Sequence, residues 1–90
     1  MSKRIDFSKS FEKAYARRIA RNQKLKKAYT KRYCLFAQGE RGYPIHDHAL
    51  TGSLAGKRAF SIGGDLRVIY IELSSAIIFV DVGSHSQVYK

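Results

Sequence analysis

The segment Lys57–Tyr89 reads KRAFSIGGDLRVIYIELSSAIIFVDVGSHSQVY and contains three apolar runs separated by turn residues. β-Branched and aromatic residues dominate the last two runs, and these types suit a pleated, half-buried surface. Gly63-Gly64-Asp65 separates the first two runs, and Ser74-Ser75 separates the last two. Because glycine supplies the positive φ of tight hairpin turns, the pattern predicts three consecutive antiparallel strands. The runs are nearly unbroken in apolarity, so we expect both faces of this sheet to be covered.

The length and composition indicate one domain spanning residues 1–90, with a modest hydrophobic core. No apolar stretch approaches the ~20 residues of a membrane span, and the N-terminus lacks the apolar segment of a secretory signal. The single cysteine, Cys34, cannot form an internal disulfide, which fits a reducing compartment. We expect Cys34 to be a small packing residue. These features predict a cytoplasmic protein that does not bind membranes.

Positive charge is concentrated in the N-terminal half. Residues 1–45 hold 13 Lys and Arg against 3 Asp and Glu, whereas residues 46–90 hold 4 of each kind. A surface this basic attracts polyanions such as nucleic acid, an acidic protein or an anionic membrane. A solvated helix face explains part of the excess, but ordinary soluble helices mix charges of both signs. The charge distribution therefore favours a polyanionic partner.

The N-terminal half predicts a short strand followed by helices. Residues 3–7 alternate polar and apolar side chains, which is typical of a strand. Ser8 or Ser10 could then cap a helix. Apolar side chains recur at helical spacing on both sides of Asn22, giving either a helical hairpin or one kinked helix. Its tyrosines could stack on nucleotide bases, but a stripe at this spacing more often packs in a core.

These elements predict an α+β domain of order β-α-α-β-β-β. The helical pair would pack on one face of a small antiparallel or partly mixed sheet, in which the sequence leaves the position of the first strand open.

Residues 40–56 show no periodicity and contain three glycines, the only proline and two histidines. Long loops without secondary structure are often functional. We expect this loop and the open face of the sheet to form the active groove.

Three histidines suggest a metal site, which the rest of the sequence does not support. His46 and His48 could chelate a metal from an extended segment, with Asp47 or His85 completing the site. This spacing is common by chance, and no cluster of Cys or Glu accompanies it. The sequence also lacks a glycine-rich phosphate-binding loop. We therefore expect neither a metal nor a cofactor.

Acid–base chemistry on an RNA phosphodiester is the remaining possibility. Attack by the 2′-hydroxyl needs a base, a proton donor for the leaving 5′-oxygen and a cation for the phosphorus oxygens. Histidine can transfer either proton, and arginine is the best fixed cation for phosphate. The candidates are His48, His85, Arg58 and Arg67. Alternatively, Arg67 only pairs with Asp65 or Asp81, and His85 only caps a strand.

Two motifs resemble those of RelE/YafQ-like toxins from bacterial type II toxin–antitoxin systems. One is His-x-Leu-Thr-Gly at residues 48–52, and the other is Gly-Ser-His-Ser-x-x-Tyr at residues 83–89. The chain length and the predicted order of elements extend the likeness over the whole sequence. This resemblance implies a ribosome-dependent endoribonuclease that cuts messenger RNA without a cofactor. It also implies a cognate antitoxin protein that neutralises the toxin.

The resemblance assigns a role to five residues. His48 matches a loop histidine, and His85 matches a terminal histidine. Asp65 matches an acidic residue after the hairpin turn. Arg67 stands where RelE-like toxins have an arginine that stabilises the scissile phosphate. Tyr89 matches a terminal aromatic residue that stacks on a base.

The sequence also departs from both toxin patterns. Ser61 replaces a second catalytic histidine, and Leu66 replaces an aromatic residue. Asp81 stands where YafQ-like toxins have an arginine, and Phe60 where RelE-like toxins have a lysine. Arg58 occupies the position of the first RelE-like strand lysine, so we expect it to contact RNA. The predicted site is therefore a hybrid with fewer cations than either pattern.

Other functional classes remain open. ParE-like toxins share the fold and bind a protein target, DNA gyrase, without an acid–base set. A plain RNA-binding module would use the basic helices but would not need His48 and His85, and these two residues favour RNA cleavage. We expect the basic helices to bind ribosomal RNA through Lys24, Lys26, Lys27, Lys31 and Arg32.

Overall fold

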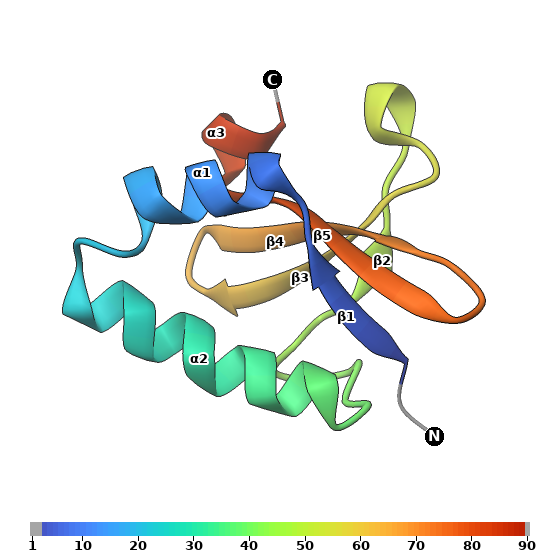
Figure 1. The fold of residues 1–90 in the computed structure, drawn as a ribbon, viewed down its shortest axis with the longest axis horizontal. Coiled ribbons are helices and arrows are strands. Elements are labelled where there is room, and N and C mark those ends of the chain that lie inside the picture. Colours follow the sequence, from blue (N-terminus) through green and yellow to red (C-terminus); the bar gives the residue numbers. More distant parts are fainter. Residues whose placement is uncertain (1–2, 90) are drawn as a thin grey trace.

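The computed structural model describes residues 3–89 and shows a five-stranded sheet with two helices on one face (Figure 1). The predicted α+β class is confirmed. The helices are α1 (Lys9–Arg18), α2 (Gln23–Ala37) and α3 (His85–Val88). The strands are β1 (Arg4–Phe7), β2 (His48–Ala49), β3 (Arg58–Gly63), β4 (Leu66–Glu72) and β5 (Ala76–Ser84). A 3₁₀ helix covers Gly52–Leu54.

The sheet has the order β1-β5-β4-β3-β2. Strands β3, β4 and β5 form the predicted antiparallel meander. Gly63 and Gly64 have φ angles of 126° and 50°, which explains why glycine is needed in the first turn. Strand β1 pairs in parallel with β5 at one edge, so the sheet is mixed. Strand β2 pairs antiparallel with β3 at the other edge.

Two polar caps define the helical hairpin. The Ser8 hydroxyl accepts a hydrogen bond from the Phe11 backbone N–H at 3.1 Å and begins α1. The Asn22 side chain accepts from the Leu25 N–H at 3.2 Å and begins α2, so the helices form a hairpin rather than one kinked helix. Cys34 lies exposed on α2, and its expected packing role is wrong.

The main core fills the space between the helical pair and the sheet. Its largest aromatic side chains are Phe11, Phe36, Phe60, Tyr70 and Phe79. Tyr15, Tyr29 and Tyr33 are partly buried against this cluster, as expected for a core stripe. Tyr15 and Tyr29 meet edge-on with ring centroids 5.1 Å apart. None of the helices within residues 3–89 is long and apolar enough to cross a membrane.

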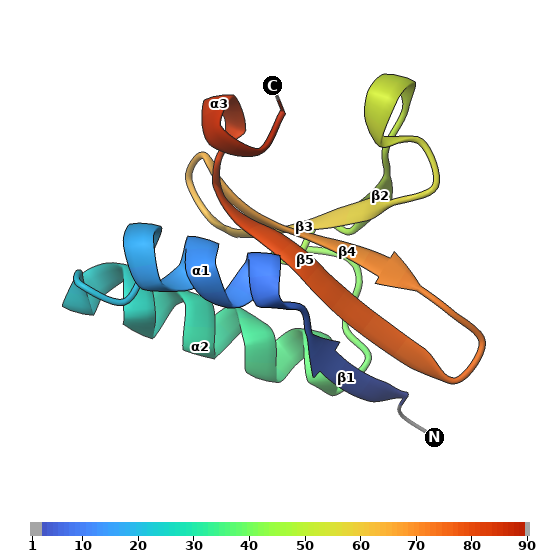
Figure 2. The same ribbon diagram turned by 45° about the horizontal axis from the view of Figure 1, so that its top comes forward.

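The opposite face of the sheet carries a second, smaller cluster. Figure 2 shows α3 and the 3₁₀ segment on the side away from α1 and α2. Val88 packs there on Ala59 and Ile69, with Leu50 and Tyr89 beside them. Both faces are thus covered near α3, as predicted. The expectation of a structureless loop over residues 40–56 is wrong, because it contains β2 and the 3₁₀ helix.

Candidate active site

A cavity of about 440 Å³ lies on the sheet face opposite the helical pair. One wall is formed by residues of the segment 48–54, and the other by Arg67, His85 and Tyr89. The cavity therefore brings together four of the five candidate catalytic residues, including His48. It also places residues 48–54 opposite the C-terminal segment.

The end of β5 positions His85 and Tyr89. Ser84 begins α3 with a capping box, in which the Gln87 side-chain oxygen accepts from the Ser84 backbone N–H at 2.8 Å. His85 and Tyr89 are one helical turn apart, and their rings meet edge-on with centroids 4.5 Å apart. His85 is exposed, whereas Tyr89 is partly buried. The short helix thus presents an accessible imidazole beside an anchored aromatic ring.

Arg67 lies in β4 opposite Gly83 of β5. Its Nε and the Tyr89 hydroxyl are both buried, and neither has a hydrogen-bond partner within residues 3–89. Burial raises the pKa of Tyr89, although the positive charge of Arg67 acts to lower it. Buried polar groups normally find partners because leaving them unpaired costs free energy. Two residues that line the cavity thus each hold a buried polar atom without a hydrogen-bond partner among residues 3–89.

The structure does not support the alternative that Arg67 only pairs with Asp65 or Asp81. Within the described residues Arg67 forms no ion pair with Asp65 or Asp81. The Asp81 carboxylate instead lies 3.1 Å from Arg18 Nη1, which also donates to the Val82 carbonyl at 3.0 Å. The departure at Asp81 therefore joins α1 to β5, and Arg67 has no ion-pair partner among residues 3–89.

His48 lies in β2 at the rim of the cavity. Its backbone pairs with Ala59 of β3. Its ring is exposed, and Nδ1 lies 2.9 Å from the backbone carbonyl oxygen of His46. Within residues 3–89 no cluster of His, Cys, Asp and Glu side chains is arranged to hold a metal ion.

A partly buried ion-pair network centred on Asp47 adjoins His48, and sequence reasoning missed it. The Asp47 side chain is only 3% exposed and accepts hydrogen bonds from Arg41, Arg58 and the Tyr70 hydroxyl. Burial alone would raise the pKa of Asp47, but the hydrogen bonds from Arg58, Tyr70 and Arg41 outweigh it and lower the pKa. Arg41 also binds Glu72 at 2.9 Å. The sequence indicated Asp47 only as a conceivable metal ligand.

Arg58 belongs to this network and not to the cavity. Its Nη2 lies 2.8 Å from Asp47, and its Nε donates to the Tyr70 hydroxyl at 3.3 Å. The structure thus commits much of the guanidinium to holding Asp47, whereas the sequence predicted contact with RNA.

Asp65 and the positions that depart from the toxin patterns also lie outside the cavity lining. Asp65 is exposed in the turn between β3 and β4. Ser61 pairs with Arg67 across the strands, and its hydroxyl accepts from the Gly63 N–H at 3.2 Å. Phe60 is fully buried and stacks on Phe36 with centroids 4.4 Å apart, while Leu66 packs against the same core. Phe60 and Leu66 are therefore core residues.

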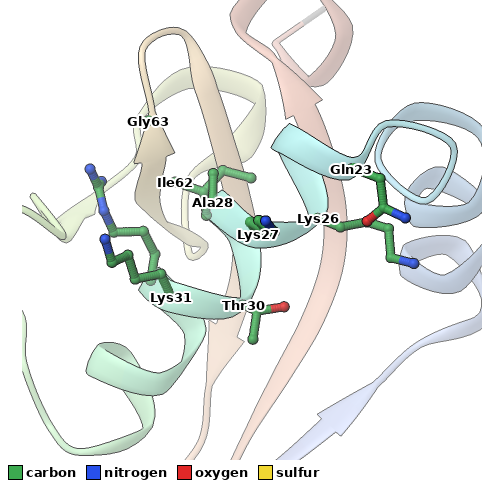
Figure 3. Close-up of a pocket in the computed structure, with 9 residues that line it drawn as sticks. Gln23, Lys26, Lys27, Ala28, Thr30, Lys31, Ile62 and Gly63 are labelled. Carbon is green, nitrogen blue, oxygen red and sulfur yellow. The ribbon is translucent and has the colours of Figure 1, made fainter.

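The basic residues of α2 surround a separate hollow of about 720 Å³ on the helical face (Figure 3). Lys26, Lys27 and Lys31 line it together with Arg32 and Ile62 of β3. Arg32 donates to the backbone carbonyls of Pro44 and Ser61 at 3.0 and 3.3 Å, so it also joins α2 to the sheet. Lys24 is exposed on the same helix but does not line the hollow. The predicted ribosome-binding cations and the cavity thus occupy different faces.

Protonation of Glu72, which binds Arg41 in this network, should reduce the stability of the protein in acid. Hydrogen bonds from Arg41 and Lys3 lower the pKa of Glu72 to about 2, from 4.5. A carboxylate with a lowered pKa in the folded state contributes stability above its unfolded pKa, and this is lost as pH falls through the folded value. The free energy of unfolding should therefore decrease between pH 5 and pH 2. We expect this decrease to be smaller in Glu72→Gln than in the unsubstituted protein, by about 1 kcal/mol.

Denaturant titration across this pH range measures the effect. Asp65→Asn is the matched control, because Asp65 forms no ion pair within the described residues. An equal pH dependence in Glu72→Gln and the unsubstituted protein would show that this ion pair does not stabilise the fold.

Comparisons with known proteins place the chain in a family. Residues 3–90 match the model of the YafQ toxin family, described as bacterial toxins of type II toxin–antitoxin systems. No curated protein matches the sequence. A DinJ–YafQ complex from E. coli is similar in structure, with 21% identity, a TM-score of 0.79, and coverage of 98% of this chain and 99% of that chain.

Two further solved structures cover the same shares of this chain and of their own, 98% and 99%. YafQ from E. coli strain BL21(DE3) has 18% identity and a TM-score of 0.77. A copper-bound mutant toxin from Helicobacter pylori has 25% identity and a TM-score of 0.73. The family match covers almost the whole chain, and the chain therefore belongs to the YafQ family of toxins from bacterial type II toxin–antitoxin systems.

Proposed function

We propose that this toxin is a ribosome-dependent endoribonuclease that cleaves messenger RNA in the cytoplasm and so inhibits translation. The observation that supports this most is the composition of the cavity. It holds two histidines and an arginine without an ion-pair partner among residues 3–89. This is the set of groups that cleavage by the 2′-hydroxyl requires.

The proposed reaction uses one proton acceptor and one proton donor. His48 takes the proton of the 2′-hydroxyl, whose oxygen attacks the phosphorus. The bond from phosphorus to the 5′-oxygen breaks, and His85 gives a proton to that oxygen. The products are a 2′,3′-cyclic phosphate and a 5′-hydroxyl. Arg67 stabilises the charge that builds on the phosphorus oxygens.

The remaining assigned residues would bind the substrate. Tyr89 would stack on a base beside His85, an interaction worth ~1–3 kcal/mol per base. A role for Asp65 requires the message to reach the exposed turn between β3 and β4. No step of the proposed reaction requires a metal or cofactor. A chelator selective for transition metals should therefore leave the cleavage rate unchanged.

The toxin family and the solved DinJ–YafQ complex support a cognate antitoxin as partner. A chain with a formal net charge of +10 should bind an acidic antitoxin rapidly, because complementary charge accelerates association. Co-expression with the neighbouring reading frame should yield a complex that is stable in moderate salt. Separate elution of the two proteins at low salt would contradict this pairing.

Induced expression tests the function directly. We expect protein synthesis to stop within minutes, with transcripts cut inside their coding regions. Induction of the His85→Gln variant serves as the control, because it should leave transcripts intact. Continued translation together with a DNA-damage response would support a ParE-like toxin that binds gyrase instead.

The basic face of α2 should contribute to ribosome binding. Replacing Lys24, Lys26 and Lys27 with Glu should weaken the affinity for ribosomes and reduce its dependence on salt, because fewer counterions are released on binding. Sedimentation with ribosomes at several salt concentrations measures both effects. The matched control replaces Lys9, Lys13 and Arg17 with Glu. These residues are exposed on α1, and their replacement changes the net charge by the same amount. Equal weakening by both triple variants would show that only net charge matters.

A further inference from the structure

We propose that His46 is a positioning residue, whose backbone carbonyl fixes the imidazole of His48 in the tautomer that accepts a proton at Nε2. This inference rests on the proposed function, because it explains how His48 becomes the base in RNA cleavage. It assigns a role to the backbone of His46 and none to its side chain.

The hydrogen bond determines which ring nitrogen carries the hydrogen. His48 Nδ1 lies 2.9 Å from the His46 carbonyl oxygen. A carbonyl oxygen can only accept, so in the neutral ring Nδ1 must be the donor and Nε2 keeps its lone pair. Nε2 has no hydrogen-bond partner within residues 3–89. The nitrogen that can accept a proton is therefore free for a substrate hydroxyl in the adjoining cavity.

The backbone of His46 has an unusual conformation that directs this carbonyl. His46 is the only non-glycine residue with a positive φ within residues 3–89, at 53°. This left-handed conformation is unfavourable for residues with a side chain, and it persists where the surroundings enforce it. Its side chain is exposed, and its ring meets the Tyr43 ring edge-on with centroids 5.6 Å apart. The conformation of His46 thus orients its backbone carbonyl and is not needed to place its imidazole.

The residues on either side of His46 enforce the conformation. Ile45 is fully buried, and its carbonyl accepts from the Ser61 N–H at 2.7 Å. Asp47 is held on the other side, where its carboxylate binds Arg58 at 2.8 Å and its N–H donates to the Arg41 carbonyl at 2.8 Å. Two anchored residues therefore leave His46 little freedom. The Asp47 network acquires a function here, because it holds the peptide that orients His48.

Two substitutions at His46 separate the backbone from the side chain. Both His46→Asn and His46→Val remove the imidazole, but Asn tolerates the left-handed region whereas β-branched Val strongly resists it. We expect His46→Asn to cleave ribosome-bound message within about 3-fold of the unsubstituted rate. His46→Val should cleave at least about 10-fold more slowly. Ribosome affinity should be equal in both variants.

Imidazole ¹⁵N NMR gives a readout that does not depend on cleavage. At a pH where the ring is neutral, His48 should show the hydrogen on Nδ1 in the free protein and in His46→Asn. In His46→Val, and in Asp47→Asn as a second variant that loosens the same peptide, the hydrogen should shift towards Nε2. Denaturant titration checks that each variant is folded, and the Asp47→Asn spectra carry the test if His46→Val does not fold.

The outcomes distinguish the inference from the proposed function. A hydrogen on Nε2 of His48 in the unsubstituted protein would overturn the positioning role, even if RNA is cleaved. Equal cleavage rates in His46→Asn and His46→Val with unchanged tautomers would overturn it as well. If the tautomers shift as expected but no protein cleaves RNA, the positioning of His48 stands and the nuclease function is wrong.

Discussion

Replacing His85 with Gln is expected to lower the rate of single-turnover cleavage of ribosome-bound message by ~10²–10⁴-fold, the typical contribution of a proton-transfer residue. Glutamine retains hydrogen-bonding groups but cannot donate a proton to the leaving 5′-oxygen. Because proton donation matters mainly in the transition state, ribosome affinity should remain nearly unchanged. The effect should therefore appear in the cleavage rate at saturating ribosome concentration.

The structure indicates that His85→Gln will fold. The imidazole is exposed, and α3 is capped by Ser84 and Gln87 and anchored by the buried Val88. Ser86→Ala is the matched control, since Ser86 is exposed on the same helix but does not line the cavity. His48→Gln should be impaired to a similar extent if His48 is the base. A much milder effect at His48 would mean that it only orients the nucleotide.

Local signals in the sequence predicted much of the fold. The glycines at 63 and 64 predicted the first hairpin, and Ser8 was one of two candidate caps for the first helix, because capping depends on residues close in sequence. The sequence left open a helical hairpin or one kinked helix around Asn22, and the cap by Asn22 decides for the hairpin. The start of α3 was missed, although Ser84 and Gln87 have the spacing of a capping box, because the apolar run read as a continuing strand.

Features that depend on distant residues could not be predicted. The place of β1 follows from its pairing with β5, more than sixty residues away in the chain, and β2 is too short to give a periodic signal. His48, Arg67 and His85 were candidates because their types stood out against apolar strands, whereas Tyr89 followed only from the resemblance to a toxin family. The role of Arg58 could not be predicted, because its partner Asp47 lies in a loop whose path the sequence does not determine.

Replacing Arg67 with Ala is expected to lower the cleavage rate by ~10²–10³-fold, the usual effect of removing a positioned charge donor. Arg67 forms no ion pair within residues 3–89, and its buried Nε lacks a partner there. Its loss should therefore leave the free energy of unfolding nearly unchanged. Arg67→Lys should recover only part of the rate, since a point charge cannot replace a planar guanidinium.

Arg58 provides the matched comparison, because it is an arginine on the neighbouring strand whose guanidinium is bound to the buried Asp47. Arg58→Ala should reduce stability, since it removes a partner from a buried carboxylate. Denaturant titration and single-turnover cleavage, measured on both alanine variants, should thus show opposite profiles. A stability loss in Arg67→Ala as large as in Arg58→Ala would mean that Arg67 is structural. Full activity in both Arg67→Ala and His85→Gln would mean that the reaction does not use this cavity.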